Sequence, residues 1–480
     1  MRLVCLAINV YEHITNYLCP KCNSRHPSYR MCTWREMEGT ASTQTVAIHL
    51  GVISSTVTRS EYQMTEHKLS RLMQFLYPVT PPYTIMKSAL VLASIVGLLI
   101  VSYACTEQSA SVDVDPYAAI KARFGTRIDP TNLLNYANQS VPSYITKDNG
   151  RANPITNAKA TLGRVLFYDK SLSIDNTIAC GSCHKQQFAF SDTALASSGV
   201  QGGLTSRHSM RLINTRFADE VKFFWDERAA TLEAQTTKPI QDHAEMGFSG
   251  QNGRPDLNSL INKLNGIDYY KELFQFAYGS PTITEQRLQE SLSSFIRSIQ
   301  SFDSKYDIGR ATAPNDGAPF QNFTTQENSG KQLFLQAPQF DATGSRIGGG
   351  FGCQGCHRAP EFDIDPNSRN NGVTRALNNV AGPDFFITRS PTLRDVVNAT
   401  GGSNGPFMHS GVFATLPIAI GHYNIVNAVA GNNNLDPRLR PGGNGQRLNM
   451  TPAEQSALVA FLRTLSGRNV YTDERWSNPF

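Results

Sequence analysis

Four of the nine cysteines form two copies of one pattern, and each copy ends in a histidine. The copies are Cys180-Gly-Ser-Cys183-His184 and Cys353-Gln-Gly-Cys356-His357. This C-x-x-C-H spacing is the attachment signature of haem c, in which both thiols bond to the porphyrin and the histidine becomes the proximal iron ligand. Disulfides or zinc half-sites are the alternative, but neither needs a histidine directly after each second cysteine. The sequence therefore predicts two covalently bound haem c groups.

Related helical segments precede the two copies. LGRVLFYD at 162–169 precedes the first copy, and GKQLF at 330–334 precedes the second. Two further stretches, 284–299 and 451–465, place apolar residues at helical spacing after the capping residues Thr284 and Thr451. Long Gly-, Asn- and Pro-rich stretches separate the helices, with few strand signals. We expect a mainly α fold with two cytochrome c-like haem domains, long loops and little strand.

The 480 residues leave room for two or three domains. The expected organisation is a leader over 1–85, an export signal over 86–105, a linker and N-terminal segment over 106–155, an N-terminal haem c domain over 156–325, a C-terminal haem c domain over 326–470 and a tail over 471–480.

The segment 86–105, MKSALVLASIVGLLIVSYAC, resembles a bacterial export signal. Its apolar run, 89–101, is shorter than the roughly 20 residues that a membrane span requires. We expect translation to start at Met86, the alternative being a cytoplasmic arm on a signal anchor. Cys105 resembles the lipidated cysteine of a lipoprotein, which would tether the mature chain to the membrane. The expected location is the periplasm, where bacterial haem c is attached.

The formal net charge of +5 does not predict nucleic-acid binding. Residues 1–105 hold nine Lys and Arg against five Glu, so the remainder carries 35 basic and 34 acidic residues. A nearly neutral body lacks the basic surface of a nucleic-acid-binding protein. With 40% hydrophobic and 17% charged residues, the composition is that of a globular protein.

From about Leu162 to Gly467, the ordered motifs resemble the bacterial di-haem cytochrome c peroxidases and their relative MauG. Beside the haem motifs, these are LGRVLFYD, FFWDERAATLEAQ, PIQDHAEMG, RSPTLRDV and GPFMHSG. The resemblance implies that the N-terminal haem reacts with hydrogen peroxide and that the C-terminal haem transfers electrons.

The resemblance also implies a peroxide pocket of Gln235, Pro239 and Glu245. Glu245 would move a proton between the peroxide oxygens, as cleavage of the O–O bond requires an acid/base. Gln235 would donate a hydrogen bond to the oxygen ligand, and Pro239 would crowd the iron so that no side chain ligates it. Trp225 matches the residue that lies between the two haems and carries electrons.

Two departures from the family pattern affect the haem ligands. Residues 185–207 contain no histidine that could block the first iron, and we interpret His208 as structural, so a five-coordinate N-terminal haem is expected. His208 also replaces an Asn of the calcium site found in the family. Calcium is therefore left open, with Asn404 and Pro406 as contacts.

The second departure is Tyr423, which lies 14 residues after His409 where the peroxidases have a Met ligand and MauG has Tyr. A phenolate ligand favours ferric iron and lowers the potential. Met408 and His422 are the alternative ligands.

The expected function is reduction of hydrogen peroxide by a di-haem c peroxidase, with electrons from a small donor such as cytochrome c or a cupredoxin. The first alternative is MauG-like oxidation of Trp or Tyr residues on a partner protein, and the second is a non-catalytic electron-transfer cytochrome. Neither the donor nor a homodimer can be read from the sequence.

Overall fold

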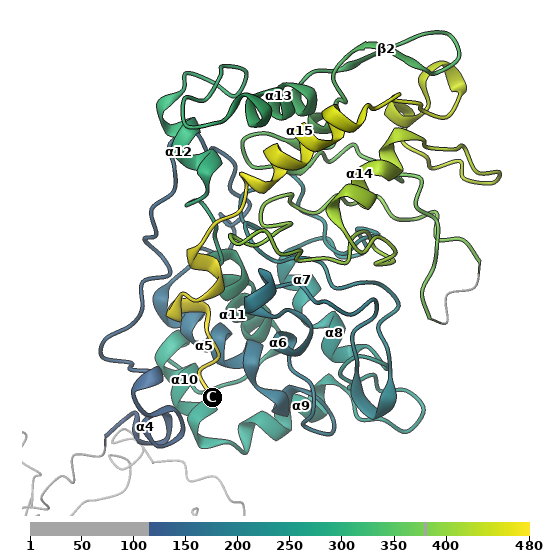
Figure 1. Ribbon diagram of the computed structural model, residues 1–480. Helices are drawn as coiled ribbons and strands as arrows, with labels where there is room; N and C mark the ends of the chain where they lie inside the picture. Colours follow the sequence, from purple (N-terminus) through teal and green to yellow (C-terminus); the bar gives the residue numbers. More distant parts are fainter. Residues whose placement is uncertain (1–114, 379–381) are drawn as a thin grey trace, which may run out of the picture. The chain divides into compact units, whose positions relative to one another are not determined.

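The computed structural model describes residues 115–378 and 382–480, and this part of the chain is mainly helical (Figure 1). The α-helices are α4 (Ala118–Phe124), α5 (Asn157–Tyr168), α6 (Cys180–Cys183), α7 (Leu232–Thr236), α8 (Lys238–Gln241), α9 (Leu257–Asn265), α10 (Asp268–Tyr278), α11 (Glu285–Ser298), α12 (Lys305–Thr312), α13 (Thr325–Leu335), α14 (Leu416–Asn424) and α15 (Pro452–Arg463). Two short antiparallel pairs are β1 (Pro338–Phe340) with β2 (Arg346–Gly349), and β3 (His357–Arg358) with β4 (Asp363–Ile364). The expected mainly α fold is confirmed.

No helix within the described residues is both long and apolar enough to cross a bilayer. The leader, the export signal and Cys105 lie outside the described residues.

The two expected helix caps are present. Thr284 begins α11 by accepting a hydrogen bond from the Arg287 amide, and Thr451 forms a reciprocal capping box with Glu454 at the start of α15. Both helices therefore begin where local side-chain chemistry predicted.

Two helix pairs repeat the same close crossing. Helix α5 packs on α11, and α13 packs on α15, as Figure 1 shows for the latter pair. A Cβ on Gly163 would lie 2.0 Å from the Ser291 carbonyl oxygen, and one on Gly330 would lie 1.9 Å from that of Ala457. These glycines occupy equivalent positions in the repeated sequence, so the same requirement for close backbone approach sets both crossings.

A buried cation follows each of these glycines. Arg164 donates hydrogen bonds to the Ser477 carbonyl oxygen at 2.7 Å and to its hydroxyl at 3.0 Å. Lys331 donates to the carbonyl oxygens of Asp316, at 2.8 Å, and Ala318. Each cation thereby holds an irregular segment against its helix pair.

The buried hydrophobic residues form two clusters. The first includes side chains of α4, α5, α10 and α11 together with Trp476, and the second includes side chains of α12, α13 and α15. Segments expected to be linker and tail therefore contribute to the first cluster, and Tyr306 of α12 contributes to the second. The haem domain boundaries, 156–325 and 326–470, stay a prediction.

The crossing of α13 and α15 gives a stability prediction. We expect Gly330→Ala to destabilise the protein by about 3 kcal/mol, because the new methyl group overlaps the Ala457 carbonyl and forces the helices apart. Thermal unfolding followed by circular dichroism measures the change. Gly421→Ala is the matched control, since its Cβ would approach other atoms no closer than 3.8 Å. Equal melting temperatures for the two variants would contradict the prediction.

Candidate haem sites

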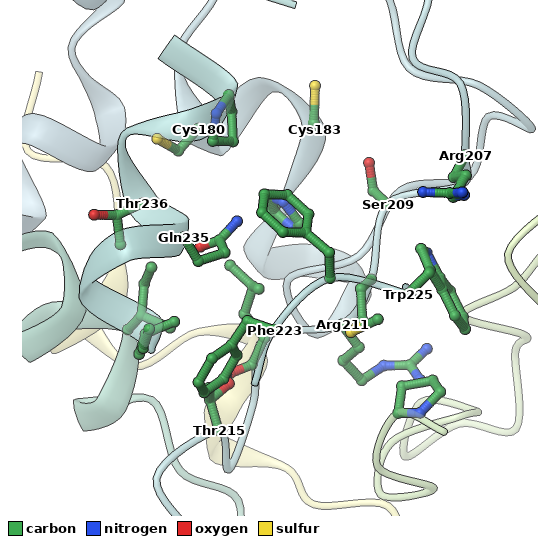
Figure 2. A pocket seen from close by; sticks show the side chains of 18 of the residues that line it. Cys180, Cys183, Arg207, Ser209, Arg211, Thr215, Phe223, Trp225, Gln235 and Thr236 are labelled. Atoms are coloured by element: carbon green, nitrogen blue, oxygen red, sulfur yellow. The ribbon is translucent and has the colours of Figure 1, made fainter. Parts of the chain in front are cut away.

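The first C-x-x-C-H motif lines a largely apolar cavity. Helix α6 carries both cysteines, and His184 follows as its C-cap. The same cavity receives four of the predicted site residues, which are Trp225, Gln235, Pro239 and Glu245. Figure 2 shows Cys180, Cys183, Gln235 and Trp225 around it.

The motif histidines are suited to bind iron. Burial lowers the pKa of His184, and it lowers that of His357 to about 4, so both rings are neutral at neutral pH. The His184 Nδ1–H donates to the Phe190 carbonyl oxygen at 3.1 Å. This hydrogen bond leaves the Nε2 lone pair free for a metal.

The four motif cysteines are free thiols. Burial raises their pKa values, to about 12 for Cys180 and about 11 for Cys183. Within the described residues, no group of three or more metal-ligating side chains could hold an ion such as zinc. Paired thiols beside a neutral histidine, in an apolar cavity, fit covalently attached haem.

Glu245 lies in the turn after α8, and its side chain lines the first cavity. Its backbone amide donates to the Asp242 carboxylate at 3.0 Å. Burial, with a smaller contribution from the negative charge of Asp242, raises the pKa of the Glu245 carboxyl to about 7. A carboxyl with this pKa can accept and return a proton at neutral pH.

Two glycines that the sequence analysis missed support this turn. A Cβ on Gly199 would lie 1.9 Å from the Ala244 carbonyl oxygen, and one on Gly203 would lie 2.3 Å from it. In addition, the Val200 amide donates to the Glu245 carbonyl oxygen at 3.0 Å. The turn position of Glu245 therefore depends on a close backbone approach that no local pattern in the sequence signals.

Gln235 and Pro239 come from the two short helices on this side of the cavity. Thr231 caps α7 by accepting from the Ala234 amide, and Gln235 lies in its last turn. Pro239 lies in the first turn of α8, where a proline leaves no unmade helical hydrogen bond.

Trp225 lines both cavities. Its indole N–H donates to the His208 carbonyl oxygen at 2.8 Å, and its ring centroid lies 6.2 Å from that of His409. Its carbonyl oxygen accepts hydrogen bonds from the amides of Thr388 and Arg389. The indole is thus fixed between the two cavities, as the bridging prediction requires, and its electron-transfer role stays a prediction.

His208 is buried and makes contacts consistent with a structural residue. Its Nδ1–H donates to the Ala194 carbonyl oxygen at 2.8 Å, and its backbone amide donates to the His409 carbonyl oxygen at 2.6 Å. These bonds connect the RHSM segment to the PFMHSG segment.

The second C-x-x-C-H motif lines a second cavity together with Tyr423 and Met408. Tyr423 is half-buried on α14, and the removal of its hydroxyl from water raises its pKa. The Asn371 amide lies 3.2 Å from the Tyr423 hydroxyl and 3.3 Å from the Met408 sulfur. Both candidate ligands therefore meet at one donor, which the sequence analysis did not identify.

His422 differs from these two candidates. Its Nε2–H donates to the Asn371 carbonyl oxygen at 2.9 Å, and its ring lies 5.4 Å from the Phe413 ring. It is not among the residues that line the second cavity. The structure thus favours Tyr423 or Met408 as the ligand.

Of the two residues expected near calcium, Asn404 is fully buried. Its carbonyl oxygen accepts from Arg211 at 3.0 Å, and its side-chain amide donates to the Asp395 carbonyl oxygen and the Tyr471 hydroxyl. Pro406 lies two residues further on. The hydrogen bond from Arg211 was not anticipated.

Comparison with known proteins agrees with this geometry. Residues 157–312 match the sequence model of the family described as di-haem cytochrome c peroxidase. The chain is 28% identical to the methylamine utilization protein MauG of Methylophilus methylotrophus over 322 residues, which is 66% of this chain and 84% of MauG. It is 25% identical to cytochrome c551 peroxidase of Pseudomonas aeruginosa, covering 68% of this chain and 84% of that enzyme.

A solved structure of a MauG-like protein associated with microbial copper homeostasis has the same fold. It aligns with a TM-score of 0.54 and 26% identity, covering 71% of this chain and 99% of that protein.

The helical fold and the two C-x-x-C-H cavities define a protein of the di-haem c class. Residues 157–312 match the di-haem cytochrome c peroxidase family, and the chain is similar over about two thirds of its length to proteins named MauG and cytochrome c551 peroxidase.

Proposed function

We propose that this protein reduces hydrogen peroxide to water with electrons from a periplasmic donor such as cytochrome c or a cupredoxin. The observation that carries the proposal is the position of Glu245. A carboxyl with a pKa of about 7 lines the same cavity as the haem-binding residues Cys180, Cys183 and His184.

Haem iron in the first cavity would supply the redox chemistry that breaks the O–O bond. Glu245 accepts a proton from one oxygen of hydrogen peroxide and returns it to the other, which leaves as water. Two electrons and two further protons complete the reaction, so each hydrogen peroxide yields two waters. The protein thereby separates proton movement, at Glu245, from electron delivery.

Gln235 and Pro239 would favour binding of peroxide, and not of a protein side chain, in the first cavity. The Gln235 amide donates a hydrogen bond that orients the peroxide, and the Pro239 ring offers no atom that could ligate iron. Apart from His184, the only histidine among the described residues that line this cavity is His208, whose Nδ1–H donates to Ala194 while its Nε2 has no hydrogen-bond partner among these residues. The five-coordinate N-terminal haem stays a prediction, and a low-spin resting spectrum that His208→Ala converts to high-spin would show that His208 is the ligand instead.

Electrons would enter at the second haem, held by Cys353, Cys356 and His357, and cross by Trp225. An indole that lines both cavities shortens the gap that electrons must cross. The segment 86–105 supports export to the periplasm, with Cys105 as a membrane tether. The identity of the donor and a homodimer stay open.

The direct test is peroxide-dependent oxidation of a reduced donor. We expect the purified holoprotein, with two haems by intact mass, to oxidise reduced cytochrome c or a reduced cupredoxin only when hydrogen peroxide is added. The absence of peroxide-dependent turnover with every donor and every artificial reductant would contradict the proposal. Such inertness in a protein with both haems attached would favour the non-catalytic electron-transfer cytochrome instead.

Tyr423 favours a second candidate function, MauG-like oxidation of Trp or Tyr residues on a partner protein. It lines the second cavity and accepts a hydrogen bond from the Asn371 amide, a donor that would stabilise a phenolate ligand. Such a ligand would let the second haem share in storing the oxidising power of peroxide.

The second candidate predicts a ligand-dependent reaction with peroxide. We expect Tyr423→Phe to change the visible and EPR spectra of one haem. We also expect stoichiometric peroxide, added to the ferric protein without reductant, to give a long-lived spectral change that this variant lacks. Met408→Leu is the control, because it removes the competing ligand at the same Asn371 donor. Identical spectra for wild type and Tyr423→Phe would exclude tyrosine ligation and leave the peroxidase function in place.

A further inference from the structure

Both candidate haem cavities share two cations, the half-buried Arg211 and the buried Arg389. The residues common to the two cavities are Arg211, Trp225, Arg389, Ser390, Pro391 and Thr392. An arginine stays protonated in a protein, so each guanidinium brings a full positive charge into this region. A buried charge is costly unless an opposite charge or several hydrogen bonds compensate it.

The other arginines of the first cavity are neutralised by carboxylates. Arg207 lies 2.6 Å from a carboxylate oxygen of Asp226 and 2.9 Å from one of Asp384, and Arg228 lies 2.8 Å from Asp226. In the second cavity, Arg438 pairs with Asp436 and Asp365. The protein thus provides carboxylate partners for these cations.

Arg211 and Arg389 form no ion pair within the described part of the chain. Arg211 donates one hydrogen bond, to the Asn404 carbonyl oxygen, and Arg389 donates one to the Lys222 carbonyl oxygen. The Nε atoms of both side chains are buried without a hydrogen-bond partner among these residues. Two guanidinium groups therefore lack the anions that their burial calls for.

The group expected in each cavity carries anions. Each haem has two propionate carboxylates, and a guanidinium binds a carboxylate through parallel N–H···O bonds. In Figure 2, Arg211 lies on the same side of the first cavity as Trp225, away from the thiols of Cys180 and Cys183. The polar edge of a haem attached through those thiols would therefore be directed toward the shared arginines.

We propose that Arg211 and Arg389 form one binding site for the propionates of both haems, and that Arg211 supplies the positive charge expected from a calcium ion. This inference rests on the proposed di-haem function. A calcium ion bound to the Asn404 carbonyl oxygen would lie beside the guanidinium that already donates to the same atom. Like charges at that separation repel each other. The residue that replaces the family's calcium ligand, His208, directs its Nδ1–H to Ala194 instead.

The test compares holoprotein variants by redox titration, with haem content measured by intact mass. A nearby positive charge stabilises ferrous over ferric haem, so its removal lowers the midpoint potential. We expect Arg211→Gln and Arg389→Gln to lower the midpoint potentials of both haems. Arg211→Lys keeps the positive charge, so it should lower them less than Arg211→Gln does. Arg228→Gln is the matched control, because it removes the same charge from the first cavity but at an exposed residue paired with Asp226. Its shift should be smaller and confined to one haem.

Elemental analysis and chelation test the second half of the proposal. We expect wild-type holoprotein to contain no stoichiometric calcium and to keep its spectra and potentials after treatment with a calcium chelator. One calcium per chain whose removal changes the spectra would overturn the assignment, as would unchanged potentials in Arg211→Gln and Arg389→Gln.

A second variant and the haem content distinguish failure of the arginine assignment from failure of the proposed function. If Arg211→Gln does not accumulate, Arg211→Lys carries the test, because the propionate bands in its resonance Raman spectrum should shift when bidentate binding is lost. Unshifted bands overturn the proposal. A wild-type protein without attached haem overturns the proposed function itself, whereas two attached haems with unmoved potentials overturn only the role of the arginines.

Discussion

Glu245→Gln should lower peroxide turnover roughly 100- to 10,000-fold, the range associated with loss of a general acid/base. The amide keeps the size of the side chain but cannot accept a proton from hydrogen peroxide. Haem content and resting spectrum should stay as in wild type, because the Glu245 side chain makes no hydrogen bond to the described part of the chain and is not needed for attachment. Steady-state oxidation of a reduced donor measures the loss.

The pH dependence gives the same prediction a second readout. Burial raises the pKa of Glu245 to about 7, so below this pH the carboxyl is protonated and cannot take the first proton. In wild type, kcat/KM for peroxide should rise as pH increases through about 7, and this rise should be absent in Glu245→Gln. Glu227→Gln is the control, since burial also raises the pKa of Glu227 but this residue lines neither cavity. A similar loss in both variants would show that Glu245 has no special role.

Cys180→Ala/Cys183→Ala should remove one covalent haem and abolish the reaction with peroxide. Both thiols line the cavity that holds Glu245, so their loss leaves the acid/base without a reactive centre. Intact mass should show one haem, and peroxide should leave the spectrum of the remaining haem unchanged.

Cys353→Ala/Cys356→Ala is the matched variant at the other cavity. It should also lose one haem, but the remaining haem should still respond to peroxide, while turnover with a reduced donor falls. A peroxide response that survives loss of the first pair and disappears with the second pair would reverse the assigned roles of the two haems.

The parts of the site that depend on adjacent residues could be predicted from the sequence. The two C-x-x-C-H motifs, the caps at Thr284 and Thr451 and the glycine-containing helical repeat are all local patterns, and the structure contains the caps and the repeat. The pocket of Gln235, Pro239 and Glu245 came from family resemblance, and the structure brings all three to one cavity.

The parts that depend on distant contacts could not be predicted. The shortage of carboxylates around Arg211 and Arg389 is visible only once ion pairs such as Arg207 with Asp384 are known, because these partners are far apart in the chain. Similarly, Asn371 reaches Tyr423 across 52 residues. Nothing in the composition of these segments indicates which donor meets which acceptor.

The segment over 471–480 was expected to be a tail, yet it contributes to the first hydrophobic cluster. Trp476 is buried there, and its carbonyl oxygen accepts from the Tyr168 hydroxyl at 2.6 Å. Under the proposed export, Cys180 and Cys183 would leave the cytoplasm long before the C-terminal segment that completes their hydrophobic cluster. The enzymes that attach haem would therefore act on an N-terminal half whose hydrophobic cluster is incomplete. Trp476 would complete this cluster only after haem has been attached. Translation order itself would thus favour attachment before closure.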